Sequence, residues 1–234
     1  VVNAPLDLTT LEALGRIGRM SNVVELRSTA QAGSSPGAQR LTIELKAVDD
    51  AYPLYGAVAL ESGGALSDAL AVRDGLAGAV VEPDVLVRLD LAIGDVLRIG
   101  DVRFQIRDRM TREPDRLSAG TFLVGPRVLV PLKALEATGL AERGSLVEHR
   151  TRVRFPEDTT VEQAMRAVAD LEPGRGWETQ SPDQAAERVR EVMDRTTTFL
   201  GVAGLAAFAV GLTGAWAAVS MWIGRRRRTI AQYR

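Results

Sequence analysis

Three pairs of neighbouring carboxylates are the residues of this sequence best suited to chemistry. They are Glu82/Asp84, Glu113/Asp115 and Asp49/Asp50. Two carboxylates serve as general acid and general base when their surroundings separate their pKa values. Each pair here stands beside a proline or in a turn context, where Asp and Glu are ordinarily solvated or cap a helix. We therefore expect solvated or capping residues at these positions, and no catalytic residue.

Other catalytic and cofactor-binding arrangements lack the residues they need. His149 is the only histidine and there is no cysteine, so neither a zinc site of the His/Cys type nor a Ser-His triad can be assembled. We expect His149 at the surface or at a strand edge. Ser62-Gly63-Gly64 is not followed by Gly-Lys-Ser/Thr, so it is not a phosphate-binding loop. The sequence predicts no enzyme activity, no cofactor and no metal, and any ATPase would be a separate chain.

Charge is distributed unevenly along the 234 residues, whose formal net charge is −1. From residue 196 onward there are five arginines and no Asp or Glu. Residues 1–195 therefore hold 24 basic and 30 acidic residues, a formal charge of −6. Because an acidic body repels phosphate backbones, we expect no nucleic-acid partner, despite the four consecutive arginines Arg225–Arg228.

Residues 196–224 form a run of 29 positions without a charge. About 20 apolar residues in a helix cross the hydrocarbon core of a bilayer. We therefore predict a transmembrane helix, the alternative being a buried core helix of a soluble protein. Basic residues next to a span stay on the cytoplasmic side, and Trp222 lies where an interfacial aromatic is expected. We expect Arg225–Arg228 in the cytoplasm and 1–195 on the periplasmic or extracytoplasmic side.

Small residues recur every four positions within this run, at Ala203, Ala207, Gly211 and Ala215. Such a stripe lets another helix approach closely, and close packing drives helix association in lipid. The alternative is that a chain rich in Ala and Gly produces the stripe by chance. We predict packing against other transmembrane helices of the same protein, in contact with membrane lipid.

The first fifty residues are predicted to form a helix and a hairpin. The helix covers 6–18, where Thr9 and Glu12 have capping-box spacing. Strands at 22–28 and 40–48 alternate on either side of a loop rich in Gly, Ser and Pro, which indicates a hairpin.

A second group of elements is predicted near residue 150. It consists of a strand at 150–155, a helix over 158–174 and a short strand at 177–180. Thr159 and Glu162 have capping-box spacing at the start of that helix. The order indicates a βαβ unit, and the first fifty residues resemble a partner for it.

Residues 51–147 contain turn and helix-boundary signals of their own. We predict a strand followed by a short helix beginning near Pro83, and then a hairpin folded at Gly100-Asp101. Residues 127–140 indicate a strand that runs into a helix ending at Gly139. We interpret this part as a β-rich subdomain inserted into an α+β core.

The predicted organisation is a periplasmic α+β domain followed by one transmembrane helix. Its parts are a core of 1–50 and 148–182, an inserted subdomain of 51–147, a stalk helix of 183–195, a transmembrane helix of 196–224 and a cytoplasmic segment of 225–234. No Gly or Pro interrupts 183–200, so stalk and span are expected to form one continuous helix.

Four stretches of the sequence resemble bacterial FtsX-like ABC transporter permeases, and most closely the YbbP-type branch. They are IELKAVDDAYPLYG at 43–56, AVVEPDVLVRLDLAIGDVLRIGDVRFQIRDRMTREPDR at 79–116, GPRVLVPLKALEATGL at 125–140 and GRRRRTIAQYR at 224–234. The run around Gly94-Asp95 is common to many MacB-like periplasmic domains. The stretch KAVDDAYPLYG is more specific and favours the YbbP-type branch.

The resemblance implies a permease segment of the bacterial inner membrane. A first span would precede Val1, and the arginine-rich stretch after the second span would lead into a cytoplasmic coupling helix. The residues implied in topology and coupling are Arg225, Arg226, Arg227, Arg228, Thr229 and Ile230. A separate cytoplasmic ABC ATPase would bind there, and its ATP hydrolysis would move the periplasmic domain to export or extract a hydrophobic or lipid-like substrate.

A different class of protein fits the span and the arginines as well. An extracytoplasmic sensor or anchor domain on a single span would show the same charge asymmetry. The residues that follow Arg234 discriminate the two, because further apolar spans favour the permease and a signalling module favours the sensor.

Overall fold

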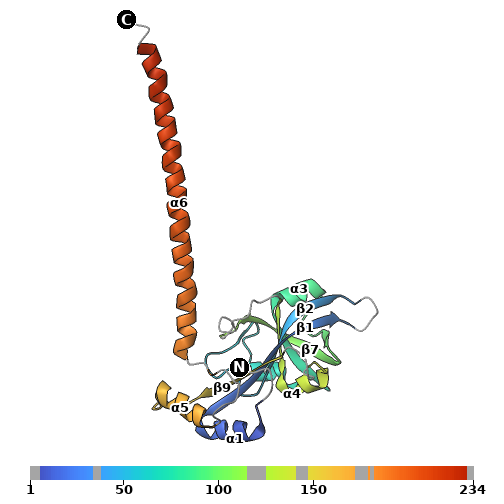
Figure 1. Ribbon diagram of the computed structural model, residues 1–234. Helices are drawn as coiled ribbons and strands as arrows, with labels where there is room; N and C mark the ends of the chain where they lie inside the picture. The colour runs from blue at the N-terminus through green and yellow to red at the C-terminus, as the bar shows by residue number, and fades with distance from the viewer. Residues whose placement is uncertain are drawn as a thin grey trace. The chain divides into compact units, whose positions relative to one another are not determined.

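A computed structural model describes residues 6–33, 38–114, 125–140, 147–171, 179 and 182–230, with side chains in the last range at 196, 197 and 199–222. The chain divides into two compact units, Val1–Thr179 and Gln180–Arg234. The first mixes strands with short helices and the second contains one long helix, drawn in orange and red in Figure 1. The predicted α+β class followed by a helix is confirmed.

A single sheet organises the first unit, and nine strands belong to it among the described residues. They are β1 (Arg19–Ala32), β2 (Arg40–Val48), β3 (Ala59–Leu60), β4 (Val72–Arg73), β5 (Leu76–Val81), β6 (Val96–Ile99), β7 (Val102–Arg112), β8 (Arg127–Pro131) and β9 (Val147–Arg154). Six of them close into a barrel in the order β7-β6-β1-β2-β8-β5, with β5 returning to β7. The pairs β2–β8 and β5–β7 are parallel, and the other pairs in the ring are antiparallel.

The barrel interior is the main hydrophobic core. Successive side chains of a strand point to opposite faces, so alternate residues of each barrel strand fill the interior. Leu45 and Phe104, for example, are 0% exposed. Full burial of such a side chain contributes about 1.5–3 kcal/mol. A second cluster, which includes Val80 and Leu129, packs on the outer wall beneath residues 52–70.

Short helices flank this barrel. They are α1 (Leu8–Ile17), α2 (Leu66–Leu70), α3 (Pro83–Leu89), α4 (Leu132–Leu135) with the 3₁₀ turn η2 (Glu136–Thr138), and α5 (Val161–Leu171). The predicted start of a helix at Pro83 is confirmed. Val85, Leu89 and Leu135 join the interior core, which shows that α3 and α4 pack on the barrel.

The start of α1 differs from the predicted capping box at Thr9 and Glu12. Asp7 is the N-cap, and its carboxylate Oδ1 accepts a hydrogen bond of 2.7 Å from the backbone N–H of Thr10. The prediction was wrong because Asp7, a stronger N-cap than Thr, precedes the first apolar residue and reaches the free amides first.

The start of α5 does carry a capping box, but one residue later than predicted. The Thr160 hydroxyl accepts from the Gln163 amide at 3.3 Å, and the Gln163 side chain accepts from the Thr160 amide at 3.0 Å. Thr159 and Glu162 have the same spacing, but the helix begins at Val161, so the residue directly before it is the cap.

The two ends of the first unit meet as the sequence predicted. β9 pairs antiparallel with β1, and α1 contacts α5. The predicted hairpin of 22–28 and 40–48 is confirmed, with β1 extended to Arg19–Ala32. The predicted strand at 177–180 lies outside the described residues except for Thr179.

Strands of the predicted insert pair directly with strands of the predicted core. Within 51–147, β6 pairs with β1 and β8 pairs with β2. The predicted hairpin at Gly100-Asp101 is confirmed as the β6–β7 turn. Gly100 has a φ of 58°, and a Cβ there would lie 2.2 Å from the Thr138 carbonyl oxygen. Only glycine therefore fits this turn.

The second unit is built on α6, Pro182–Ile230, an uninterrupted helix of 49 residues. It contains the predicted stalk segment of 183–195 and the apolar run of 196–224. No break separates these two parts of the helix.

Candidate functional site

Helix α6 carries the apolar segment that could cross a membrane. Phe199–Trp222, 24 residues, is the candidate span among the described residues by length and composition, and none of its apolar window is buried. Large apolar side chains such as Phe199 and Trp216 are 72% and 77% exposed. A core helix of a soluble protein would bury these side chains, so their exposure favours the predicted span.

The small-residue stripe lies on this exposed helix. Ala203, Ala207, Gly211 and Ala215 are all exposed. A Cβ added at Gly211 would meet nothing within 4 Å. Among the described residues no helix packs on the stripe, and its packing against another transmembrane helix stays a prediction.

The predicted coupling residues form the last turns of α6. The helix continues through Arg225, Arg226, Arg227, Arg228 and Thr229 and ends at Ile230. The side chains of these residues lie outside the described ones, as do 231–234. Their role in topology and in binding an ATPase therefore stays a prediction.

Asp49 and Asp50 behave as the sequence predicted. Asp49 accepts hydrogen bonds from the Ser21 hydroxyl at 2.8 Å and from the backbone amides of Asn22 and Ala51 at 2.6 and 3.1 Å. It caps the turn after β2. Asp50 lies at the surface, 2.6 Å from the Lys133 ammonium.

In the other two acidic pairs, Asp84 is exposed and Glu82 partly exposed, whereas Glu113 is buried. Asp84 is exposed and 3.7 Å from Arg88, one turn along α3. Glu82 accepts a hydrogen bond of 3.0 Å from the Arg127 amide. Asp115 lies outside the described residues. Glu113 is buried, so the expectation of a solvated residue is wrong at this position.

Glu113 belongs to a buried charge cluster on the outer wall of the barrel. The cluster consists of Glu25, Glu44, Lys46, Glu113 and Arg127. One Glu113 carboxylate oxygen lies 2.5 Å from the Lys46 ammonium, and the other lies 2.7 Å from the Arg127 guanidinium. The side chains of all three residues are 0% exposed.

Two further carboxylates and a phenol complete the surroundings of the cluster. Glu44 lies 3.0 Å from Arg127, and Glu25 lies 3.4 Å from Lys46. The Tyr52 hydroxyl accepts from the Lys46 ammonium at 3.0 Å and donates to Glu113 at 2.9 Å. Each buried charge therefore has an opposite charge beside it.

The arrangement fixes the protonation state of Arg127. Burial lowers the pKa of its guanidinium, but the carboxylates of Glu113, Glu25 and Glu44 raise it by more, so the pKa lies above its ordinary value. Fully paired and shielded charges have no access to a substrate. The cluster acts as a clamp that holds β1, β2, β8 and the end of β7 together.

Sequence reasoning missed this clamp, although all of its residues except Glu25 lie in the stretches that carry the family resemblance. Lys46 and Tyr52 belong to 43–56, Glu113 to 79–116 and Arg127 to 125–140. One signal was present in the sequence, because Glu44 and Lys46 alternate with apolar residues in a strand. Glu113 is 67 residues away from Lys46, and Arg127 is 83 residues away from Glu44, so pattern alone does not identify these partners.

His149 lies in β9, opposite Val24 of β1. β9 pairs with β1 alone among the described strands, so the predicted strand-edge position is confirmed. Burial lowers the pKa of the His149 imidazole. Among the described residues no group of three or more His, Cys, Asp or Glu could hold a metal ion.

The chain resembles known transporter proteins in sequence. Residues 3–171 match the family model of the MacB-like periplasmic core domain. Over 187 residues the chain is 25% identical to the "Uncharacterized ABC transporter permease YbbP" of Escherichia coli (strain K12). The match covers 80% of this chain and 22% of that protein, so the chain spans about a fifth of the relative's length.

Two solved structures align with most of this chain. The periplasmic region of MacB from Actinobacillus actinomycetemcomitans aligns with a TM-score of 0.48 and 14% identity, covering 71% of this chain and 72% of that one. The extracellular domain of the noncanonic ABC-type transporter YknZ from Gram-positive bacteria aligns with a TM-score of 0.47 and 12% identity, covering 71% and 81%.

The family match and the apolar helix agree on the setting of this chain. An ABC transporter permease relative and a candidate span in α6 together indicate a membrane location. Because the family model matches well over half of the 234 residues, the chain belongs to the MacB-like periplasmic core domain family of ABC transporter permeases.

Proposed function

We propose that this chain is the periplasmic domain and second span of an inner-membrane permease driven by a separate cytoplasmic ABC ATPase. The ATPase binds near 225–234, and ATP hydrolysis moves the periplasmic domain. The cargo is a hydrophobic or lipid-like molecule, because the first unit is joined through α6 to a span in the bilayer, where such molecules dissolve.

The observation that carries this proposal is the unbroken length of α6. One helix holds the charged segment 183–195, the apolar segment Phe199–Trp222 and the arginines Arg225–Arg228. A stiff helix transmits displacement along its length, whereas a flexible linker dissipates it. The order of the segments also matches basic residues on the cytoplasmic side and an acidic domain outside.

The proposal includes further transmembrane helices that pack on the small-residue stripe. Replacing Gly211 by Leu would wedge such a helix away, while Leu itself is favourable in lipid. We expect Gly211→Leu to insert normally in the membrane and to lose transport-linked activity. Normal activity in this variant would mean that the stripe faces lipid.

The central test compares two inserts in α6 that have equal length and different stiffness. Two versions of the full permease receive seven residues after Asp194, either Gly-Gly-Ser-Gly-Gly-Ser-Gly or the helical Ala-Glu-Ala-Ala-Lys-Ala-Ala. Seven residues add about two helical turns, so the helical insert nearly preserves the facing of both ends. Both versions are reconstituted in liposomes with the ATPase.

Movement is followed by a spin label on Val87→Cys, because Val87 is 82% exposed on α3 and this chain has no cysteine of its own. We expect an ATP-dependent change in the spectrum with the helical insert and none with the flexible insert, at equal rates of ATP hydrolysis. Equal spectral changes with both inserts would refute coupling through α6. Failure of the ATPase to bind the unaltered permease would refute the proposed partner.

A further inference from the structure

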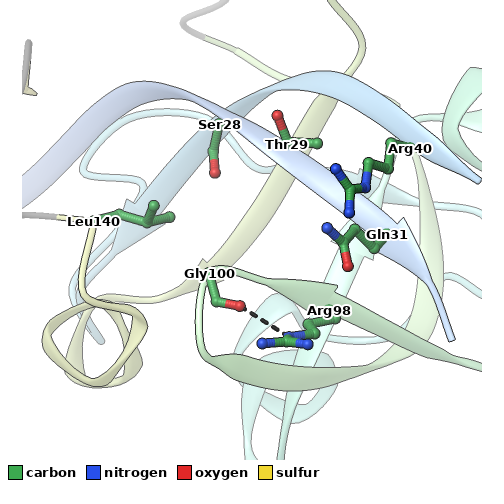
Figure 2. A pocket seen from close by; sticks show the side chains of 7 residues that line it. All are labelled: Ser28, Thr29, Gln31, Arg40, Arg98, Gly100 and Leu140. Atoms are coloured by element: carbon green, nitrogen blue, oxygen red, sulfur yellow. Dashed lines mark hydrogen bonds between the residues drawn. The ribbon is translucent and has the colours of Figure 1, made fainter. Parts of the chain in front are cut away.

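A gap in strand pairing creates a pocket on the barrel. Along one edge of β1, β9 pairs with residues 19–26 and β6 pairs with residues 30–32. Residues 27–29 lie between these two partners. A pocket of about 530 Å³ opens here, lined by Ser28, Thr29, Gln31, Arg40, Arg98, Gly100 and Leu140. Figure 2 shows these side chains around the turn at Gly100.

The pocket contains part of a cross-strand row of basic residues, which we call the arginine row. Gln31 of β1 lies directly opposite Arg40 of β2 and Arg98 of β6, and Arg98 lies opposite Arg103 of β7. Directly opposite residues share one face of a sheet, at about 4.8 Å per strand. Figure 2 shows Arg40 and Arg98 on either side of Gln31.

The arginine row lies on the outer face of the barrel. The next residues along these strands, Ala30 and Ile99, are 0% exposed and belong to the interior core. Because side chains alternate along a strand, the arginines point the other way. Arg40 and Arg103 are exposed, and the Arg98 side chain is 43% exposed. The row is therefore accessible to a ligand.

Positive charge in the row is only weakly neutralised. Asp101, 81% exposed, lies 3.7 Å from the Arg98 guanidinium. Within the part of the chain that the structure describes, neither Arg40 nor Arg103 forms an ion pair. Like charges placed directly opposite each other destabilise a sheet, as Arg98 and Arg103 are here. Such a row stands out in a body whose formal charge is −6.

One arginine is already held in position for a ligand. The Arg98 Nε–H donates a hydrogen bond of 3.1 Å to the Gly100 carbonyl, drawn as the dashed line in Figure 2. Its guanidinium lines the pocket, and one terminal nitrogen lies 3.7 Å from the exposed Asp101 carboxylate. Ser28, Thr29 and Gln31 also line the pocket and carry neutral groups that can donate hydrogen bonds.

We infer that this pocket binds a phosphate group between Arg40 and Arg98, with Gln31 between them. A phosphate offers oxygens on several sides and so accepts from two guanidinium groups on separate strands at once. A carboxylate has only two oxygens, both in one plane, and so offers fewer directions for donors from two separate strands. The phosphate is carried either by a lipid headgroup or by a small soluble ester. The site requires no coupling to ATP.

The test is a calorimetric titration of the full permease in phosphatidylcholine nanodiscs. One arm uses glycerol 1-phosphate, and the other uses a short-chain phosphatidylglycerol kept below its micelle concentration. The variant is Arg40→Gln/Arg98→Gln. The control is Arg16→Gln/Arg88→Gln, which removes the same charge from exposed positions on α1 and α3.

We expect saturable binding by the native chain and the control, weakened at least about tenfold in Arg40→Gln/Arg98→Gln because two charge-assisted contacts are lost. Arg98→Lys, which keeps the charge, should retain part of the affinity. Tighter binding of the phosphatidylglycerol assigns the site to a lipid headgroup, and equal or tighter binding of glycerol 1-phosphate assigns it to a soluble ester. No saturable binding by the native chain in either arm, or equal weakening in the control, would overturn the inference. Unchanged melting of each variant shows that it is folded.

Discussion

In the first unit the charged side chains of Lys46, Glu113 and Arg127 are fully buried on the outer wall of the barrel, and apolar residues fill the barrel interior. In α6 the reverse holds. The segment Phe199–Trp222 has no charge, and apolar side chains such as Phe208 are 65% exposed. Both regions are built from regular secondary structure, so the difference lies in the solvent that each requires.

Burial of charge and exposure of apolar surface each carry a large free-energy cost in water. The buried charge cluster offsets its cost by pairing every charge. The apolar surface of α6 has no such compensation among the described residues, and only a lipid environment or other apolar helices would remove it from water. The first unit therefore stabilises itself, whereas α6 depends on its surroundings.

The largest loss of stability is expected from breaking the buried charge cluster. Glu113→Ala breaks two fully buried ion pairs at once, so that Lys46 is left with Glu25 at 3.4 Å and Arg127 with Glu44 at 3.0 Å. This change should lower the free energy of unfolding by about 3–5 kcal/mol. Hydrogen exchange of β2 and β8 measures this loss locally. The matched control is Glu61→Ala, which breaks a half-exposed ion pair with Arg109 and should cost about 1 kcal/mol or less. Similar losses in both variants would show that Glu113 is not a clamp.

A comparable effect is expected on the membrane side from replacing Arg225–Arg228 by Gln. Each arginine near an anionic surface contributes about 1 kcal/mol, so about 4 kcal/mol of orientational preference is lost. Labelling of Val87→Cys from either side of the membrane reads the orientation. The charge-matched control replaces four exposed arginines of the first unit, namely Arg16, Arg27, Arg88 and Arg103. Unchanged orientation in the variant that lacks Arg225–Arg228 would show that these arginines do not determine the topology.

Substitutions of one glycine in each unit should have smaller effects, which differ because the two glycines are packed differently. A Cβ at Gly78 in β5 would lie 1.8 Å from the Ala69 carbonyl oxygen, so Gly78→Ala forces a backbone shift and should cost about 1–3 kcal/mol of stability. Gly211→Ala meets nothing within 4 Å and should leave membrane insertion unchanged. Exchange protection of β5 and a membrane-insertion assay give the two readouts. A loss of insertion in Gly211→Ala would contradict the open surroundings of that residue.

The smallest expected effect is the pH dependence contributed by His149. Burial lowers its pKa in the folded state below the ordinary value of 6.5, so the unfolded chain binds a proton first as the pH falls. Stability is therefore unaffected above pH 6.5 and decreases below it, until the folded pKa is passed. Melting temperatures between pH 8 and 5 should show this decrease, and His149→Gln should reduce it. An identical pH profile in His149→Gln would assign the decrease to other groups.

Local patterns in the sequence predicted the elements well. Alternation and the intervening Gly/Ser/Pro loop predicted the β1–β2 hairpin, Pro83 predicted the start of α3, and the uncharged run of 196–224 predicted the long apolar helix. These signals depend on neighbours within a few residues, such as the fixed φ of proline or the period of a strand.

Long-range pairing could not be predicted in this way. Alternation in 40–48 shows that β2 has two faces, but not that Glu44 lies beside Arg127 in a parallel pair. Closure of the barrel, the buried charge cluster and the arginine row all depend on such register. Only the register places Gln31 between Arg40 and Arg98, which are 58 residues apart in sequence.

Closure of the barrel also bears on aggregation. An open sheet edge is a template for pairing with another chain, and a ring of six strands has no such edge. Three described strands, β3, β4 and β9, lie outside the ring, and two features limit their tendency to pair with another chain. β3 and β4 are two residues long, and β9 carries Arg150, Arg152 and Arg154 at alternate positions. Charged side chains along β9 and the shortness of β3 and β4 therefore oppose edge-to-edge pairing between neighbouring copies.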